Sequence, residues 1–117
     1  MYDKHFEKFE REVMETIIAE NTDISEILEK QYKSAKVISR EFTGVGFFTC
    51  FDVTNESYKL PEALNTELGT VHAKLRGLEI GAGFILFVRK GFISTLEGYT
   101  YDGSWPISVE GYVLVKD

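Results

Sequence analysis

The first third of the chain carries apolar residues at the spacing of one helix face. They recur every three or four positions with charged residues opposite them, and no Gly or Pro interrupts residues 1–36. The apolar positions are Phe6, Phe9, Val13, Met14, Ile17 and Ile18. This pattern predicts an amphipathic helix over residues 3–19.

The polar stretch Asn21-Thr22-Asp23 interrupts the pattern and predicts that one helix ends and another begins. Asp23 together with Glu26, or Thr22 alone, would cap a second helix over 23–36. Its apolar face is expected from Ile24, Ile27, Leu28 and Ala35. A connection this short makes the two helices neighbours, either antiparallel or steeply crossed.

From Val37 onward, β-branched and aromatic residues dominate, and glycines separate them into short runs. The candidate strands are residues 37–43, 46–53, 69–77, 82–89, 92–101 and 108–115. The tripeptide Arg89-Lys90-Gly91 predicts a tight hairpin turn with Gly91 at positive φ. No long helical pattern lies between the later strands, which excludes parallel crossover units and predicts an antiparallel sheet.

Together these patterns predict an α+β fold in a single domain spanning residues 1–117. Two N-terminal helices (1–36) are expected to pack on one face of a curved, mainly antiparallel sheet of five to six strands (37–117). Gly98 and Gly111 lie inside candidate strands and indicate a strongly bent sheet. A bent sheet closed by helices forms a cup, which is a shape that binds small molecules.

The connection at residues 54–68, TNESYKLPEALNTEL, is the one long segment without a strand pattern. Pro61 is expected to open a short helical turn there, and Gly69 to end it. Long connections in small domains often carry function, and others are simply long. The sequence leaves both interpretations open for this segment.

Two Gly-x-Gly-Phe stretches, GVGFF at 44–48 and GAGFI at 81–85, raise the question of phosphate binding. A phosphate-binding loop needs glycines followed by a helix whose N-terminus faces the anion. Strand residues follow both stretches here, and neither carries the Lys-Ser/Thr of a nucleotide loop. We therefore expect bends or bulges in strands, with each glycine leaving room for a neighbouring aromatic ring.

Charge and composition limit the classes of molecule that this protein is expected to bind. The chain has 13 Lys and Arg against 19 Asp and Glu, for a net charge of −6. An acidic surface repels nucleic-acid phosphates and anionic lipid, so neither partner is expected, whereas a basic protein would be attracted. Cys50 is the one cysteine and has no partner for an internal disulfide. Without an apolar run of signal-peptide or membrane-spanning length, we expect a cytoplasmic protein.

Strand alternation places the chemistry-bearing side chains of this half. Phe48, Cys50 and Asp52 share one strand face, and His72 lies on the polar face of the next strand. Cys50, His72 and Asp52 could form a nucleophile, base and orienting acid, but nothing in their spacing brings them together. Two histidines and one cysteine also lack the short ligand pair of a zinc site. We expect no catalytic group, metal or cofactor.

The stretch LEGYTYDGSWP at 96–106 is the most unusual in the chain. Alternation gives its strand a polar face of Ile93, Thr95, Glu97, Tyr99 and Tyr101, and Trp105 follows in a turn. Tyrosine and tryptophan beside an acid are typical of protein interfaces, so Glu97, Tyr99, Tyr101 and Trp105 form a candidate partner surface. The competing interpretation is that Trp105 closes the core while the tyrosines cover the sheet.

Three segments, EFTGVGFFTCF (41–51), GLEIGAGFILFV (77–88) and LEGYTYDGSWP (96–106), together resemble a group of small, uncharacterised bacterial proteins. The resemblance covers most of residues 41–106 and leaves the helices unmatched. It implies a bacterial cytosolic protein. It transfers no catalytic residues.

Three functional hypotheses follow. The leading one is a non-enzymatic protein-binding module, by analogy a toxin-neutralising (immunity) protein. The alternative is a small-molecule binder or enzyme that uses a cup between helices and sheet, with Cys50, Asp52 and His72 as pocket residues. The third is self-association as a homodimer, in which an edge strand pairs with its copy.

Overall fold

The computed structural model describes residues 4–106, 109 and 111–116, without the side chain of Thr70. Two helices, α1 (Lys4–Glu20) and α2 (Ser25–Ser34), precede the sheet. The strands are β1 (Lys36–Phe42), β2 (Gly46–Asp52), β3 (Thr66–Leu75), β4 (Ala82–Arg89), β5 (Phe92–Thr100) and β6 (Tyr112–Lys116). Of the predicted sixth strand, residues 108 and 110 lie outside the described residues, as does the predicted helix start at residue 3.

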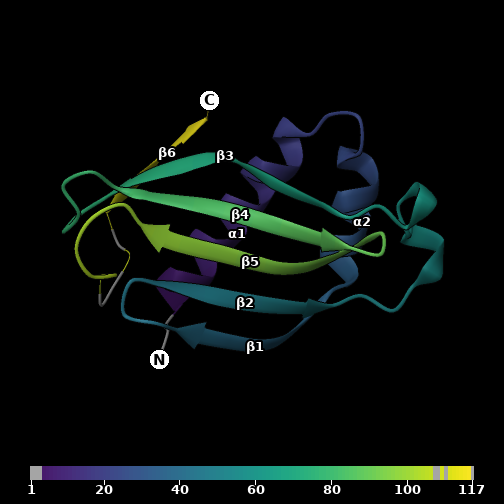
Figure 1. Ribbon diagram of the computed structural model, residues 1–117, viewed down its shortest axis with the longest axis horizontal. Helices are drawn as coiled ribbons and strands as arrows, with labels where there is room; N and C mark the ends of the chain where they lie inside the picture. The colour runs from purple at the N-terminus through teal and green to yellow at the C-terminus, as the bar shows by residue number, and fades with distance from the viewer. Residues whose placement is uncertain (1–3, 107–108, 110, 117) are drawn as a thin grey trace.

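All neighbouring strands are antiparallel, in the order β1-β2-β5-β4-β3-β6. Both helices lie behind the sheet in Figure 1, so one face is covered and the other is not. The predicted α+β arrangement is therefore confirmed, with six strands. The hairpin between β4 and β5 turns on Lys90 and Gly91, which both have positive φ. A two-residue turn of this kind matches the twist of the paired strands.

The core lies between α1 and the covered face of the sheet. The helix buries its predicted stripe, and Phe9, Val13, Met14 and Ile17 are fully inaccessible to solvent. Alternate strand residues meet the stripe; the largest of those that are fully buried are Phe47, Phe84, Leu86, Ile93 and Leu96. Each such side chain stabilises the fold by about 1.5–3 kcal/mol through removal from water. Phe47 packs edge-on against Phe6, with ring centroids 4.9 Å apart.

A buried ion pair fixes α1 over the edge of the sheet. Glu10 accepts hydrogen bonds from Arg40 Nε and Nη2 at 3.0 and 2.7 Å, and from the hydroxyl of Thr49. The side chains of Glu10 and Arg40 are only 4% and 13% exposed. Their bidentate contact joins the helix to β1, and the Thr49 contact joins it to β2.

The connection between the helices differs from the prediction. Ile24, not Thr22 or Asp23, occupies the N-cap of α2 and gives no side-chain capping bond. Asn21 explains the difference, because its amide donates to the Ile17 carbonyl at 2.7 Å and its own carbonyl accepts from Ile24 N–H. Asn21 thus ends α1. Thr22 and Asp23 form the turn that follows it and therefore do not cap α2.

Helix α2 is held by a buried amide more than by its apolar face. It buries only Leu28 and Gln31, while the rest of its predicted stripe is half-buried against the core. Gln31 Nε2 donates to the carbonyls of Tyr58 and Gly91 at 2.7 and 2.8 Å, and Gln31 Oε1 accepts from Ile93 N–H at 2.8 Å. One side chain therefore ties α2 to the β4–β5 turn and to the long connection.

The 54–68 connection passes the ends of β5 and β4 on its way from β2 to β3. As predicted, Pro61 opens a helical turn, η2 (Pro61–Ala63), and a second turn, η1 (Glu56–Tyr58), precedes it. The predicted end at Gly69 is wrong, because β3 begins at Thr66 and Gly69 lies at a bulge within it. Backbone bonds to Gly91 hold the connection against the β4–β5 turn. Its length is therefore explained by the strand order.

A bulge in β5 makes the predicted placement of Ile93 wrong. Phe87 pairs with Thr95, but the next residue, Val88, pairs with Ile93, so β5 contains one extra residue at Ser94. A bulge reverses alternation beyond it. Ile93 consequently lies in the core at 2% exposure and does not share a face with Thr95 and the residues after it.

Strands follow both Gly-x-Gly-Phe stretches, as predicted: β2 begins at Gly46 and β4 contains Gly83. The glycines make room for other groups. A Cβ on Gly98 would collide with the Phe47 ring, and one on Gly83 would lie 2.5 Å from the Tyr101 hydroxyl. Of the four glycines in the two stretches, only Gly83 makes room for aromatic side chains as predicted. A Cβ on Gly46 or Gly81 would instead meet the backbone of a neighbouring strand, and Gly44 lies beside open space.

Replacing Gln31 tests how α2 is held. Gln31→Leu preserves the volume but leaves Ile93 N–H and the Tyr58 carbonyl buried without their partner. We expect a loss of about 3 kcal/mol in the free energy of unfolding, measured by urea denaturation. Lys30→Leu, at the exposed neighbouring position, is the control and should stay within about 0.5 kcal/mol of the parent. Equal stability of the two variants would contradict the anchoring role of Gln31.

Candidate functional site

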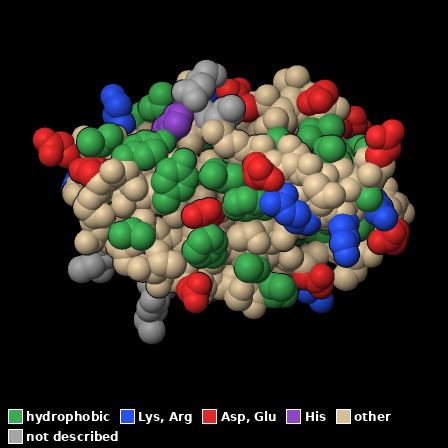
Figure 2. Space-filling model, in the orientation of Figure 1, with side chains coloured by type: hydrophobic (Ala, Val, Ile, Leu, Met, Phe, Trp, Pro, Cys, Tyr) green, Lys and Arg blue, Asp and Glu red, His purple; other side chains and the backbone are tan. Residues whose placement is uncertain are grey.

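The uncovered face of the sheet is the most distinctive surface of the molecule. Figure 2 views this face and shows hydrophobic side chains gathered across the strands, with acidic side chains among them. Strand pairing defines the residues, because directly opposed residues of an antiparallel pair lie on the same face. Those at its centre are Phe48 on β2, Glu97 and Tyr99 on β5, Ile85 and Phe87 on β4, and His72 on β3. All are partly exposed.

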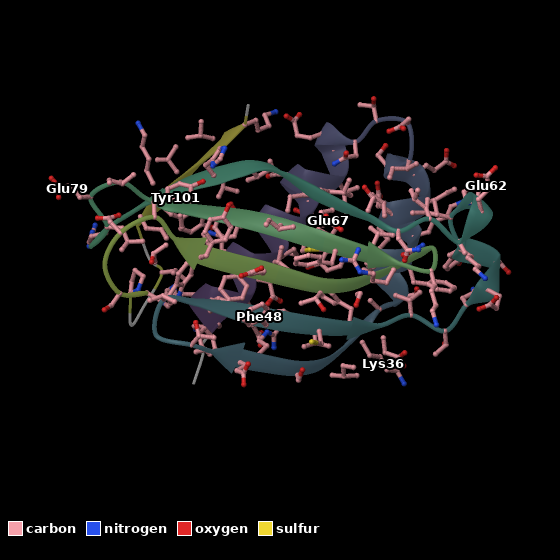
Figure 3. All side chains as sticks on the ribbon, in the orientation of Figure 1. Lys36, Phe48, Glu62, Glu67, Glu79 and Tyr101 are labelled. Atoms are coloured by element: carbon pink, nitrogen blue, oxygen red, sulfur yellow. The ribbon has the colours of Figure 1, made fainter. Side chains whose placement is uncertain are left out.

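An aromatic cluster occupies one end of this face. The rings of Tyr99 and Tyr101 pack edge-on with centroids 5.6 Å apart. The Tyr101 hydroxyl forms a short hydrogen bond with His72 Nδ1. Gly83 lies beneath both hydroxyls, so the cluster depends on the missing side chain at that position. Tyr101 remains 42% exposed, and Figure 3 shows it over the sheet on the side away from the helices.

Glu97 lies at the middle of the face, between apolar neighbours. Its opposed residues are Phe48 on one flanking strand and Ile85 on the other. The Glu97 residue is partly buried, and its carboxylate has no ion-pair partner in the part of the chain that the structure describes. An acid in an apolar surrounding is a strong point of attraction for a cation brought by another molecule.

A shallow hollow of ≈ 520 Å³ continues the face toward the other end of the sheet. Phe48, Phe87, Cys50 and Thr95 line it. Arg89 borders it and is already engaged, because it pairs with Glu67 at 3.0 Å and lies 5.1 Å from the Phe87 ring centre. The hollow therefore presents aromatic walls and a small polar floor.

The structure separates the sequence candidates into two groups. Glu97, Tyr99 and Tyr101 share the uncovered face, as expected. Trp105 does not join them: its ring packs at 5.2 Å from Phe47 on the covered side and closes that end of the core. Trp105 therefore belongs to the core, as the competing interpretation held, and the two tyrosines lie on the uncovered face.

The alternative pocket residues do not converge. Cys50 lines the shallow hollow, with its sulfur 3.8 Å from the Thr95 hydroxyl. Asp52 is exposed at the end of β2, and His72 is separated from both by β5 and β4. Across residues 4–106, 109 and 111–116, no three His, Cys, Asp or Glu side chains are grouped as a metal site would need. No catalytic arrangement of Cys50, Asp52 and His72 is formed.

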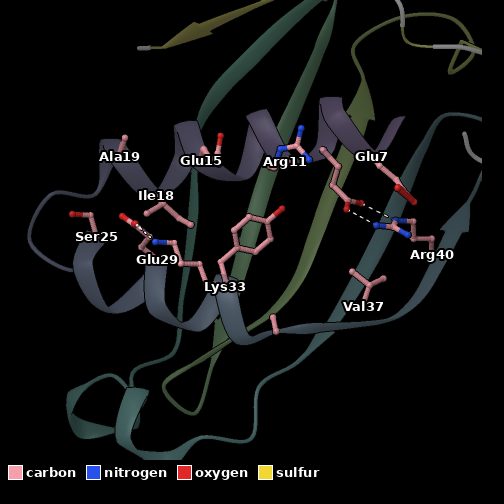
Figure 4. A pocket seen from close by; sticks show the side chains of 13 residues that line it. Glu7, Arg11, Glu15, Ile18, Ala19, Ser25, Glu29, Lys33, Val37 and Arg40 are labelled. Carbon is pink, nitrogen blue, oxygen red and sulfur yellow. Dashed lines mark hydrogen bonds and ion pairs between the residues drawn. The ribbon is translucent and has the colours of Figure 1, made fainter. Parts of the chain in front are cut away.

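A second concavity lies on the other side of the molecule, between the helices and the sheet. A cup was predicted in this place, but Cys50, Asp52 and His72 do not line it. The concavity is a cleft of ≈ 910 Å³ between α1, α2 and β1. Figure 4 shows the Glu10–Arg40 pair at one end of it. Tyr32 projects from α2 into this cleft, where burial, followed by the charges of Glu10 and Glu15, raises its pKa to about 12. Its lining residues could not be identified from local sequence patterns, because three separate elements form its walls.

Comparison with known proteins adds no relative: the chain matches no family model, no curated protein and no solved structure. Within the described residues, no helix has both the length and the apolar character needed to cross a membrane. The functional argument therefore depends on the geometry of the two surfaces.

Two glycine substitutions should separate core from surface. Gly98→Ala forces a Cβ against the fully buried Phe47 ring, and we expect a loss of about 1–3 kcal/mol in unfolding free energy. Gly83→Ala meets only the ends of two tyrosine side chains, which can rotate away. It should change stability by less than about 1 kcal/mol while disrupting the Tyr101–His72 contact. Thermal unfolding and the imidazole NMR signals of His72 would measure both effects; equal destabilisation would contradict this assignment.

The stability of the protein at alkaline pH should depend on the hydroxyls of Tyr32 and Tyr112. Burial is the largest cause that raises the pKa of both Tyr32 and Tyr112 from 10.0 to about 12, and the Tyr112 hydroxyl also donates to Glu12 at 2.7 Å. Because the folded state holds these protons more tightly than the unfolded state, their contribution is complete below pH 10 and is lost as the pH rises toward about 12. Unfolding free energy should fall over this window, and less so in the Tyr32→Phe/Tyr112→Phe variant. The same slope in both proteins would contradict the shifts.

Proposed function

We propose that the protein binds another protein through the uncovered face of its sheet, with Glu97 receiving a basic side chain of the partner. The observation that carries the proposal is the partly buried Glu97 between Phe48 and Ile85, whose carboxylate has no ion-pair partner among the described residues. A partner that covered this face without a cation would bury an uncompensated charge, which costs several kcal/mol. An arginine or lysine removes that cost and contributes a charge-assisted hydrogen bond.

The surroundings of Glu97 support a protein rather than a small ligand. Tyr99 and Tyr101 extend the contact area toward His72, and Phe48 and Phe87 extend it toward the shallow hollow. Tyrosines supply broad, rigid contact area with little loss of side-chain entropy. The net charge of −6 would also accelerate the approach of a basic partner at low ionic strength.

The specific form of this function that we propose is neutralisation of a toxic enzyme. That role requires only a surface that covers a basic part of the target. Self-association through β1 is less suitable. The strand lies at a sheet edge, but its register shifts between Val37 and Ser39, and a bulge at an edge hinders pairing with another strand.

Capture from a lysate of the source organism, with charge-matched variants, tests the proposal. Wild-type protein and Glu62→Lys should retain the same partner, because Glu62 lies in η2 at the opposite end of the molecule from Tyr101 (Figure 3). Glu97→Lys and Tyr99→Ala should lose that partner while melting within a few degrees of wild type. The affinity of the recovered pair should fall as salt is increased.

The control variants make the outcome decisive. If Glu97→Lys captures the partner as well as Glu62→Lys does, the uncovered face is not the interface. If the partner is toxic to cells, co-expression of wild type should restore growth and Glu97→Lys should not. Restoration of growth by Glu97→Lys as well as by wild type would contradict neutralisation through this face.

A further inference from the structure

The cleft between α1, α2 and β1 is independent of the uncovered sheet face. Its volume of ≈ 910 Å³ lies at the upper end of the range usual for small-molecule sites. Its lining comes from the facing sides of both helices and from the start of β1, and none of Glu97, Tyr99 or Tyr101 contributes to it. Figure 4 shows residues of the three elements around the cleft.

One part of the cleft is apolar. Ile18 on α1, Ala35 at the end of α2 and Val37 on β1 line it together with Tyr32. Val37 is 41% exposed, so part of its apolar surface meets solvent at the cleft. An apolar group bound here would remove this surface from water, which is the main source of affinity in such sites.

The charges around this apolar part are unequal. Four carboxylates (Glu7, Glu10, Glu15 and Glu29) and three cations (Arg11, Lys33 and Arg40) line the cleft. Two pairs are already formed, Arg40 with Glu10 at 2.7 Å and Lys33 with Glu29 at 3.0 Å. Among the described residues this leaves two carboxylates, Glu7 and Glu15, against the single guanidinium of Arg11, a balance of one negative charge.

The Tyr32 hydroxyl reports the sign of the field inside the cleft. Glu10 and Glu15 raise its pKa by more than Arg11 and Arg40 lower it, so the potential at the hydroxyl is negative on balance. The hydroxyl makes no hydrogen bond to another described residue and has its acceptor lone pairs available. A donor that carries positive charge is the group best matched to this position.

We propose that this cleft binds a small amphipathic organic cation, with a primary amine or guanidinium directed to Glu15 and Tyr32 and an apolar body against Ile18, Ala35 and Val37. The Tyr32 hydroxyl accepts a hydrogen bond from the cation, and Glu15 supplies the opposing charge. An anionic molecule of the same shape meets the negative potential and is rejected. The site is separate from the proposed protein interface, so either can be correct without the other.

A matched pair of probes tests the ligand class. Phenylbutylamine and phenylbutyrate have similar apolar bodies and opposite charges. We expect phenylbutylamine to bind saturably at millimolar or lower concentration, with amide NMR shifts confined to α1, α2 and the first half of β1. Phenylbutyrate should produce no saturable shifts. Bound amine should also lower the pKa of Tyr32, followed by ultraviolet absorbance, since a cation beside the hydroxyl favours the phenolate.

Variants then locate the site. Glu15→Gln should weaken amine binding about tenfold, and Val37→Trp, which adds an indole to the cleft lining at an exposed position of β1, should abolish it. The control is Glu26→Gln, an exposed acid of α2 that pairs with Lys30 and does not line the cleft. Equal binding of the two probes, absence of binding, or an unchanged affinity in Glu15→Gln and Val37→Trp would each overturn the proposal. Binding to the Glu97→Lys variant should be unaffected.

Discussion

Two helices can cover only one face of a six-stranded sheet, and this constraint determines where the molecule can interact. Both helices pack on the same side, so the core lies there and the opposite face meets solvent across its full width. A face left open in this way must combine solubility with the strand propensity of its residues. Here it does so by placing acids such as Glu97 between aromatic and β-branched neighbours. The candidate interface is thus a consequence of the fold's two-layer architecture.

Polar contacts, rather than apolar area alone, select how the layers fit. Glu10 joins α1 to Arg40 and Thr49, and Gln31 joins α2 to the β4–β5 turn. An apolar stripe can slide or rotate over a sheet at modest cost, whereas a buried carboxylate or amide has acceptable partners in one register only. The described residues contain no buried side-chain nitrogen or oxygen without a hydrogen bond, so the buried polar groups all have partners in this arrangement.

Much of the fold could be predicted from the sequence because its periodicities are clear. Helical spacing located both helices, and strand alternation placed Glu97 and Tyr99 on the outer face. Alternation failed at Ile93, because a single extra residue in β5 reverses the faces and leaves no signature in the composition. Trp105 and the cleft around Tyr32 depend on contacts between elements distant in sequence, which periodicity does not contain. Local sequence patterns therefore predicted the helices and strands, whereas the shape and lining of the two hollows depend on tertiary packing.

The sparse anchoring of α2 has a dynamic consequence. With Leu28 and Gln31 as its only fully buried side chains, this helix has far less to lose on detaching than α1 does. Elements with few buried contacts open locally at free energies well below that of global unfolding. The backbone amides of α2 should therefore exchange with solvent earlier than those of the central strands. Since α2 forms one wall of the cleft, a molecule bound there would slow that exchange.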